Sequence, residues 1–234
     1  MGVLWSVFLG SKMNEMKKQL EIESLVLAAE KFCKKESKHN NKELYGVTDG
    51  KAIGTYIEHK FQNFLSEQFV YQKGSSAKGL DLLDANIQTD IKVTSIKQPQ
   101  SSCPFRDAKQ KIFGLGYNLL IFVYDKKDDN ITQTAKLAFV SSAFISKERT
   151  ADYTTTYRLR EMIKDGANEE DIIGYLRDRN IPADEIALQA IAESILKTPP
   201  KQGYLTVSNA LQWRLQYGRV VKLKEKVEGI TKIM

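Results

Sequence analysis

Three aspartates and one lysine lie close together in the segment from residue 79 to residue 95, which reads GLDLLDANIQTDIKVTS. The segment has the pattern of a β-hairpin, and a two-residue loop at 85–86 would place Asp81 directly opposite Asp90. Lys92 would then project from the same face as Asp90, because side chains two positions apart in a strand share a face. Two opposed carboxylates repel unless a cation lies between them, so this pattern favours a metal site beside a lysine.

The sequence allows a second register for this hairpin. A three-residue loop from Asp84 to Asn86 is also favourable turn chemistry, and it would place Asp81 opposite Thr89, on the other face. Asp84 is most simply a turn residue, but it is also the alternative to Asp81 as the first carboxylate of the site. The simplest alternative for the whole segment is an exposed acidic hairpin that binds nothing.

The composition limits which ion such a site could hold. With two histidines and two cysteines, Cys33 and Cys103, a zinc site of nitrogen and sulfur ligands is not expected. Carboxylate ligands favour Mg²⁺, Mn²⁺ or Ca²⁺ instead. Two cysteines provide no disulfide framework, which is typical of a cytoplasmic protein. The formal net charge of +6 suits a polyanionic partner but does not identify one.

The first ten residues, MGVLWSVFLG, are apolar but too few to span a bilayer, and they lack the features of a signal peptide. We therefore expect a cytoplasmic protein that does not bind a membrane. An alternative start of the functional chain at Met13 would make residues 1–12 an extension, whose role the sequence does not indicate.

Hydrophobic periodicity predicts helices on both sides of the hairpin and a buried strand after it. The expected elements are helices over residues 13–35, 51–69 and 105–116, and strands over 118–126 and 136–146. Hairpin, short helix and buried strand together make a βαβ crossover, so we expect an α/β fold with a mixed central sheet flanked by helices. Glu58 lies on the second helix, beside its apolar positions.

The carboxy-terminal third has a different residue pattern from the preceding part of the chain. From residue 150 the pattern is helical, with breaks at Gly166 and Pro182. The last stretch is ambiguous, because its apolar residues alternate as in a strand, while Ser208 suits a helix N-cap and Gly218 suits the position after a helix. We favour a short helix followed by a strand.

The ordered pattern of residues 51–146 resembles the PD-(D/E)xK nuclease superfamily. Gly79-Leu80-Asp81, eight further residues and Asp90-Ile91-Lys92 match its signature, with Gly-Leu-Asp in place of the usual Pro-Asp. A helix bearing a glutamate precedes the hairpin, and a helix and a buried strand follow it. The signature is short and degenerate, so the order of the elements carries most of the resemblance.

The resemblance implies a restriction-endonuclease-like core that hydrolyses nucleic-acid phosphodiesters with Mg²⁺, or with Mn²⁺ as an alternative. Asp81, Asp90 and the carbonyl of Ile91 would bind the ion, which would lower the pKa of a bound water. Lys92 would orient that water and stabilise charge as it develops. Glu58 would bind a second ion, unless it is only a surface residue of an amphipathic helix.

DNA must also be held, and polar side chains suited to base edges or phosphates occur in two segments. One follows Lys92 directly and the other lies near the carboxy terminus; the candidates are Lys97, Gln98, Gln100, Asn209, Gln212, Arg214, Gln216 and Arg219. For any single residue of the second segment, a solvated position on a core helix is an equally simple explanation.

The pattern as a whole favours a type II restriction endonuclease of a prokaryote, acting on double-stranded DNA. Residues 1–50 would form an amino-terminal helix and linker, 51–150 the catalytic core, and 151–234 a mostly helical DNA-recognition part. Palindromic sites favour a homodimer, and a cognate methyltransferase would belong to the same system. A repair or junction nuclease of the same fold, or a non-catalytic nucleic-acid-binding protein, is the alternative. The target sequence cannot be deduced from one chain.

Overall fold

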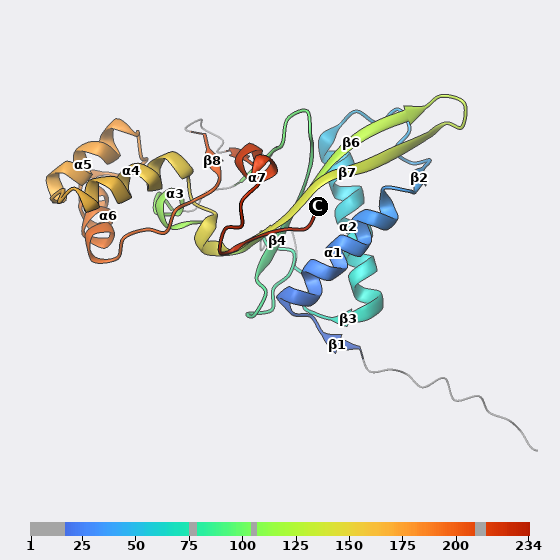
Figure 1. The fold of residues 1–234 in the computed structure, drawn as a ribbon, viewed down its shortest axis with the longest axis horizontal. Coiled ribbons are helices and arrows are strands. Elements are labelled where there is room, and N and C mark those ends of the chain that lie inside the picture. The colour runs from blue at the N-terminus through green and yellow to red at the C-terminus, as the bar shows by residue number, and fades with distance from the viewer. Residues whose placement is uncertain (1–16, 75–78, 104–106, 209–213) are drawn as a thin grey trace, which may run out of the picture.

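The computed structural model describes residues 17–74, 79–103, 107–208 and 214–234. These residues form an elongated molecule, with an α/β part at one end and a lobe of helices at the other (Figure 1). The predicted fold, a mixed central sheet flanked by helices with a helical carboxy-terminal part, is confirmed. Within the described ranges, no helix is long and apolar enough to cross a membrane.

The central sheet has the strand order β10-β7-β6-β4, and β2 pairs with β7 as well. Its strands are β2 (Asn40–Asn41), β4 (Thr89–Ser95), β6 (Asn118–Asp129), β7 (Thr134–Ile145) and β10 (Ile230–Lys232). β4 and β6 run parallel, and the connection between them contains the short helix α3 (Gln110–Phe113), so the predicted βαβ crossover is confirmed. β6 and β7 form a long antiparallel hairpin whose tip projects from the body of the molecule (Figure 1).

Two helices, α1 (Ile22–Glu36) and α2 (Gly50–Gln68), cover one face of this sheet, with α1 over β7 and α2 over β4. Both predicted helices are confirmed, although α1 begins later than expected. The reason is that Lys18–Gln19 form a short strand, β1, which pairs in parallel with β3 (Phe69–Val70). α2 begins directly after Asp49, whose carboxylate accepts hydrogen bonds from the first free N–H groups of the helix.

Aromatic rings hold α1 and α2 to the sheet. Phe32 of α1 and Phe61 of α2 both pack against Phe122 of β6, with ring centroids 5.8 and 5.0 Å apart. The neighbouring β6 residues, Ile121 and Val123, point away from these helices, because side chains alternate along a strand. Ile121 belongs to a second core made largely by the carboxy-terminal segment. A strand covered on both faces explains the continuous apolar run that predicted β6.

The helical lobe consists of α4 (Tyr153–Lys164), α5 (Glu169–Asp178) and α6 (Glu185–Lys197), interrupted near Gly166 and Pro182 as predicted. It has its own core, which includes Leu159, Ile172 and Ile191. Each of the three helices begins after an Asp or Asn that caps it through its side chain.

The final segment departs from the prediction. Its described elements are β8 (Thr206–Val207), β9 (Arg214–Gln216) and α7 (Gly218–Lys222), so the helix predicted between Ser208 and Gly218 is a strand at 214–216, while residues 209–213 lie outside the described residues. The preference for helix at 214–216 was wrong because the alternating apolar side chains, Leu215 and Tyr217 among them, are fully buried in the second core. Burial of one strand face therefore outweighed local helix propensity.

A second sheet joins two segments that are distant in the sequence. β5 (Gln100–Ser102) lies in the connection between β4 and α3, and it pairs antiparallel with β9, which in turn pairs with β8. The ends of the chain also reach the central unit, since α1 packs against β7 and β10 pairs with β7.

Candidate active site

The acidic segment is only partly a hairpin. Leu82 and Thr89 exchange two backbone hydrogen bonds of 3.0 and 3.1 Å, but the predicted strand over residues 79–84 reduces to this single bridge. The other edge of this segment faces residues 72–74, since the N–H of Leu83 donates to the carbonyl of Gln72 and the N–H of Gly74 donates to the carbonyl of Asp81. Residues 83–88 form the loop, an even number, so the pairing places Asp81 opposite Asp90. The alternative register, with Asp81 opposite Thr89, was wrong.

Asp81 contacts the edge of β4 through its side chain. Its Oδ2 accepts a hydrogen bond of 2.7 Å from the N–H of Ile91, between Asp90 and Lys92. Since the N–H and C=O of one strand residue point to the same side of the strand, the carbonyl of Ile91 faces this edge too. The Nζ of Lys92 lies 2.7 Å from Oδ2 of Asp90, so the three motif residues are within one hydrogen-bonded group.

Groups from both faces of the central sheet meet at this edge. Asp90 and Lys92 are in register with Leu119 and Ile121 of β6, so they project from the face that carries the second core. Glu58 comes from α2, on the opposite face, and lies close enough to Asp81, Asp90 and Lys92 for all three to affect its pKa. The structure therefore brings together all four residues that the sequence predicted for catalysis.

Crowding of carboxyl groups in a partly buried place changes how they ionise. The pKa of Glu58 is raised to about 8, chiefly by burial and then by the nearby Asp81 and Asp90, while Lys92 acts in the opposite direction. Burial also raises the pKa of Asp90 to about 7, with Lys92 lowering it and Asp81 raising it. Burial lowers the pKa of Lys92, but the attraction of Asp90 and Asp81 outweighs burial and the pKa is raised. Lys92 is held as an ammonium ion among more acids than it can neutralise.

The donor set suits a hard divalent cation, because carboxylate and carbonyl oxygens are the ligands that Mg²⁺, Mn²⁺ and Ca²⁺ prefer. Burial is the main cause of the raised pKa values of Glu58 and Asp90, and Asp81 adds to both, so a cation bound among these carboxyl groups would favour their ionised forms. Among the described residues, however, no three His, Cys, Asp or Glu side chains already surround a common point as metal ligands. Asp81 and Asp90 are instead engaged with the Ile91 N–H and with Lys92.

Asp84, the alternative first carboxylate, lies in a different environment. Its Oδ2 accepts a hydrogen bond of 2.8 Å from the N–H of Gln72, and its Oδ1 accepts one of 3.2 Å from the side chain of Gln19. Its carbonyl also accepts the N–H of Ile87, which closes the turn. These contacts tie Asp84 to the turn and to β1, as expected of a structural turn residue.

Two comparisons with known proteins agree. The family model described as Type II restriction enzyme NspV matches residues 19–232. The curated Type II restriction enzyme NspV of Nostoc sp. (strain ATCC 29411 / PCC 7524) is 52% identical over 211 residues, which are 90% of this chain and 95% of that protein. The chain belongs to the NspV family of type II restriction enzymes. No solved structure matches it.

Membership of the NspV family confirms the predicted activity. The protein is a site-specific deoxyribonuclease, an enzyme that binds DNA and hydrolyses its phosphodiester bonds at a particular sequence. The two alternatives, a repair or junction nuclease and a non-catalytic nucleic-acid-binding protein, are thereby set aside.

The predicted DNA-binding residues come together from both segments where they are described. Gln100 of β5 is paired with Gln216 of β9, and Arg214 lies on the same strand as Gln216. Lys97 and Gln98 are exposed in the turn between β4 and β5, directly after the strand that carries Asp90 and Lys92. Asn209 and Gln212 lie outside the described residues.

Arg219 differs from the other candidates. It is on α7, and its guanidinium lies over the ring of Tyr153, 3.9 Å from the ring centroid. This contact joins α7 to the first turn of α4, so Arg219 has a structural partner as well as an exposed position.

The sequence did not predict a group of mostly buried cysteine and tyrosine side chains close to Lys92. Cys103 is buried close enough to Lys92 to raise its pKa, and its Sγ lies 3.5 Å from the hydroxyl of Tyr117. Tyr217 is fully buried nearby and its hydroxyl lies 2.5 Å from that of Ser101. Only the position of Tyr117 gave a signal, since it directly precedes a strand parallel to β4 and parallel strands start at the same edge.

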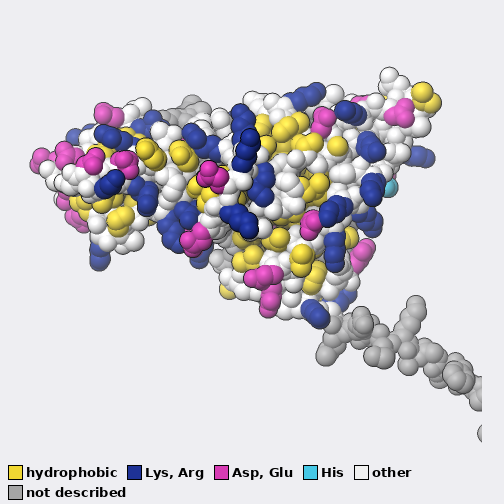
Figure 2. Space-filling view, viewed as in Figure 1, with side chains coloured by type: hydrophobic (Ala, Val, Ile, Leu, Met, Phe, Trp, Pro, Cys, Tyr) yellow, Lys and Arg dark blue, Asp and Glu magenta, His cyan; other side chains and the backbone are white. Residues whose placement is uncertain are grey.

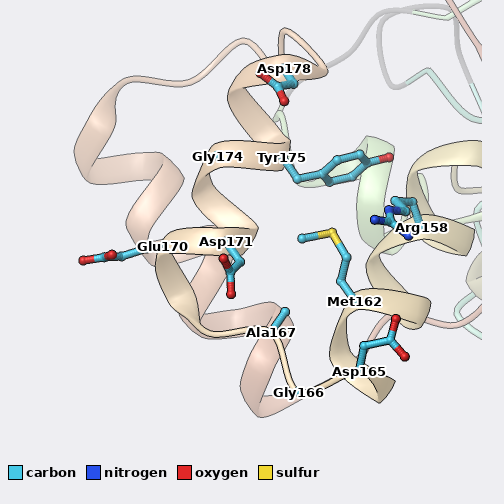
Figure 3. Close-up of a pocket in the computed structure, with 10 residues that line it drawn as sticks. All are labelled: Arg158, Met162, Asp165, Gly166, Ala167, Glu170, Asp171, Gly174, Tyr175 and Asp178. Carbon is cyan, nitrogen blue, oxygen red and sulfur yellow. The ribbon is translucent and has the colours of Figure 1, made fainter.

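The helical lobe contains a separate cavity of about 660 Å³ between α4 and α5. Figure 3 shows Arg158, Met162 and Asp165 along α4 and its end, with Asp171 and Tyr175 on α5. Further carboxylates, Glu170 and Asp178, lie at its margin. Since most of its charged groups are acidic, this cavity would repel the DNA backbone, and phosphate contacts are expected elsewhere.

The environments of Asp81 and Asp84 predict unequal effects of the same substitution. Asp81→Asn should slow single-turnover DNA cleavage by about 100- to 1000-fold, because it removes a charge from the acidic group at the β4 edge. Asp84→Asn keeps an oxygen that can accept the Gln72 N–H, so its cleavage rate should stay within about threefold of wild type. Equal losses in the two variants, with both still folded by circular dichroism, would contradict the assignment of Asp81.

Proposed function

We propose that Glu58, Asp81, Asp90 and Lys92 are the catalytic residues of this restriction enzyme, in the manner of the PD-(D/E)xK nucleases. The observation that carries the proposal is the meeting of these four side chains at one open strand edge, although they come from α2, a loop and β4. An acidic group of this kind costs folding free energy, so a chemical role accounts for it better than a structural one.

A divalent cation, Mg²⁺ or alternatively Mn²⁺, would be held by Asp81, Asp90 and the carbonyl of Ile91. When bound, such an ion neutralises charge on the phosphate and makes water a better nucleophile. The ion's arrival would compete with Lys92 for Asp90. Glu58 would bind a second ion, or would accept the proton of a water molecule once its own carboxyl group is ionised.

Lys92 would act on the phosphate directly. Its ammonium group has three N–H donors, and one of them is directed to Asp90. The remaining donors can orient the attacking water and hold a phosphate oxygen as negative charge develops. The raised pKa keeps Lys92 charged at neutral pH, so it serves as a fixed positive group rather than as a base.

DNA would contact the side of the molecule that carries β5, β9 and α7. The residues that would make these contacts are Lys97, Gln98, Gln100, Arg214, Gln216 and Arg219; the other two candidates, Asn209 and Gln212, lie outside the described residues. Figure 2 supports this placement, because Lys and Arg side chains gather over the middle of the molecule around α7, while Asp and Glu gather at the free end of the helical lobe. Positive charge is what the phosphate backbone requires.

The metal requirement is tested by removing one ligand. Asp90→Ala should abolish cleavage in Mg²⁺ and in Mn²⁺, since it removes a ligand and leaves Lys92 without its main partner. Binding to cognate duplex should persist or become tighter, because repulsion between the carboxylate and DNA phosphate is lost. Cleavage is followed in single turnover, and binding by fluorescence anisotropy in Ca²⁺. Near-normal cleavage by this variant, or by wild type in EDTA, would refute the proposed site.

We further propose that the enzyme acts as a homodimer in the cytoplasm, beside a methyltransferase that modifies the same DNA sequence. A palindromic target has two-fold symmetry, and two identical subunits match that symmetry while cutting both strands.

Sedimentation equilibrium of the protein, alone and with a cognate duplex in Ca²⁺, measures the assembly. The expected result is two protein chains per duplex. One chain per duplex, together with cleavage of both strands at the rate expected of a single subunit, would contradict the dimer.

A further inference from the structure

The sheet of β5, β9 and β8 has two unlike faces. Gln100 is paired with Gln216, and Ser102 with Arg214, while Thr206 of β8 is also paired with Gln216. Directly paired residues share a face, as do residues two apart in a strand, so all five side chains lie on the same face. The opposite face carries buried apolar residues of the second core.

The polar face is turned toward solvent. Ser102, Arg214 and Gln216 are exposed, and Gln100 and Thr206 are half-buried. Every one of these side chains can make hydrogen bonds, and none is acidic. Such a face differs from an ordinary solvated surface, which mixes charges of both signs.

A depression of about 420 Å³ borders this face. Its lining combines three glutamine amides with apolar groups, namely Gln98, Gln100, Gln216, Ile96, Pro99 and Val221. The combination matches the major-groove edge of an A·T base pair. Glutamine pairs bidentately with N6 and N7 of adenine, and apolar side chains contact the methyl group of thymine.

The polar face is joined directly to the strand that carries the catalytic motif. The Oγ1 of Thr94, two residues beyond Lys92 in β4, accepts a hydrogen bond of 3.1 Å from the N–H of Gln100. The same oxygen lies 3.0 Å from the carbonyl of Gln100. The sheet also covers the face of the central sheet from which Asp90 and Lys92 project, since Leu215 packs in the same core as Leu119 and Ile121.

We propose that the polar face of β5, β9 and β8 enters the major groove of the target, and that the cross-strand pair Gln100 and Gln216 reads adenine there. The major groove is wide enough for a two-stranded ribbon, whose strands lie about 4.8 Å apart. Thr206 and Ser102 extend the reading surface, and Ile96 and Val221 contact the thymine of the same base pair. The inference rests on the proposed function, because it places the reading surface beside the proposed catalytic strand.

The test combines a protein change with a single-atom change in DNA. The cleavage site is first mapped by sequencing the ends of digested DNA. Duplexes then carry 7-deazaadenine, which lacks the N7 acceptor, at one adenine of the site at a time. Wild type should discriminate against at least one such duplex by about 5- to 150-fold in single-turnover cleavage and in Ca²⁺ binding. Gln216→Ala should lose a similar factor on normal DNA and show no further loss on that duplex.

The matched control is Gln189→Ala, which changes an exposed glutamine on α6 and should behave as wild type on every duplex. Gln100→Ala should affect the same adenine as Gln216→Ala or the one next to it. Wild-type discrimination retained by both variants would overturn the proposal, and so would an equal loss on cognate and random DNA, which is the result of phosphate contacts.

An error in the proposed catalytic residues would give a different result from an error in the proposed reading surface. If Asp90→Ala cut DNA normally, the metal assignment would fall, but the discrimination of Gln216→Ala in Ca²⁺ binding would still report on base reading. If instead binding discrimination were unchanged in Gln216→Ala while Asp90→Ala was inactive, the reading surface alone would be wrong.

Discussion

The hydrogen bond from the N–H of Ile91 to Asp81 is the interaction on which the site depends. Among the described residues, β4 is the last strand of the central sheet on its side, and beyond the Leu82–Thr89 bridge no strand pairs with its outer edge. Asp81 occupies that edge, and in doing so it is fixed beside Asp90, Lys92 and the carbonyl of Ile91. An ordinary strand pairing would occupy the backbone groups of Ile91 at this edge, whereas Asp81 bonds its N–H through a single carboxylate oxygen.

The rest of the fold brings side chains to this edge from both faces of the central sheet. α2 packs over β4 and carries Glu58, while the carboxy-terminal segment covers the other face with β9 and Tyr217. Thr94 of β4 is hydrogen-bonded to Gln100 of β5, so a movement of the polar sheet against DNA would displace a residue two positions from Lys92. The proposed catalytic residues and the proposed reading surface are thus connected through one strand, which would suit an enzyme that must cut only its own sequence.

Local patterns were enough to predict the four side chains that meet at the β4 edge, but not the sheet of β5, β9 and β8. The helix bearing Glu58 and the buried β6 follow from hydrophobic periodicity, and the opposition of Asp81 and Asp90 follows from an even-length loop. The pairing of β5 with β9 could not be predicted, because its strands are three residues long and Ser101 and Tyr217 are 116 positions apart. The order of strand and helix after residue 213 was missed for the same reason, since distant burial decided it.

The central claim is that the fold gathers carboxyl groups at the β4 edge at a cost in stability. Glu58 has a pKa of about 8 instead of 4.5, so stability should fall as the pH rises from about 4.5 to 8, where only the unfolded state is fully ionised. Glu58→Gln removes that cost. Thermal unfolding of both proteins in EDTA should therefore show a gain in Tm for the variant that grows from pH 5 to pH 8. A difference in Tm that does not change with pH, or a variant that loses stability as the pH rises, would contradict the account.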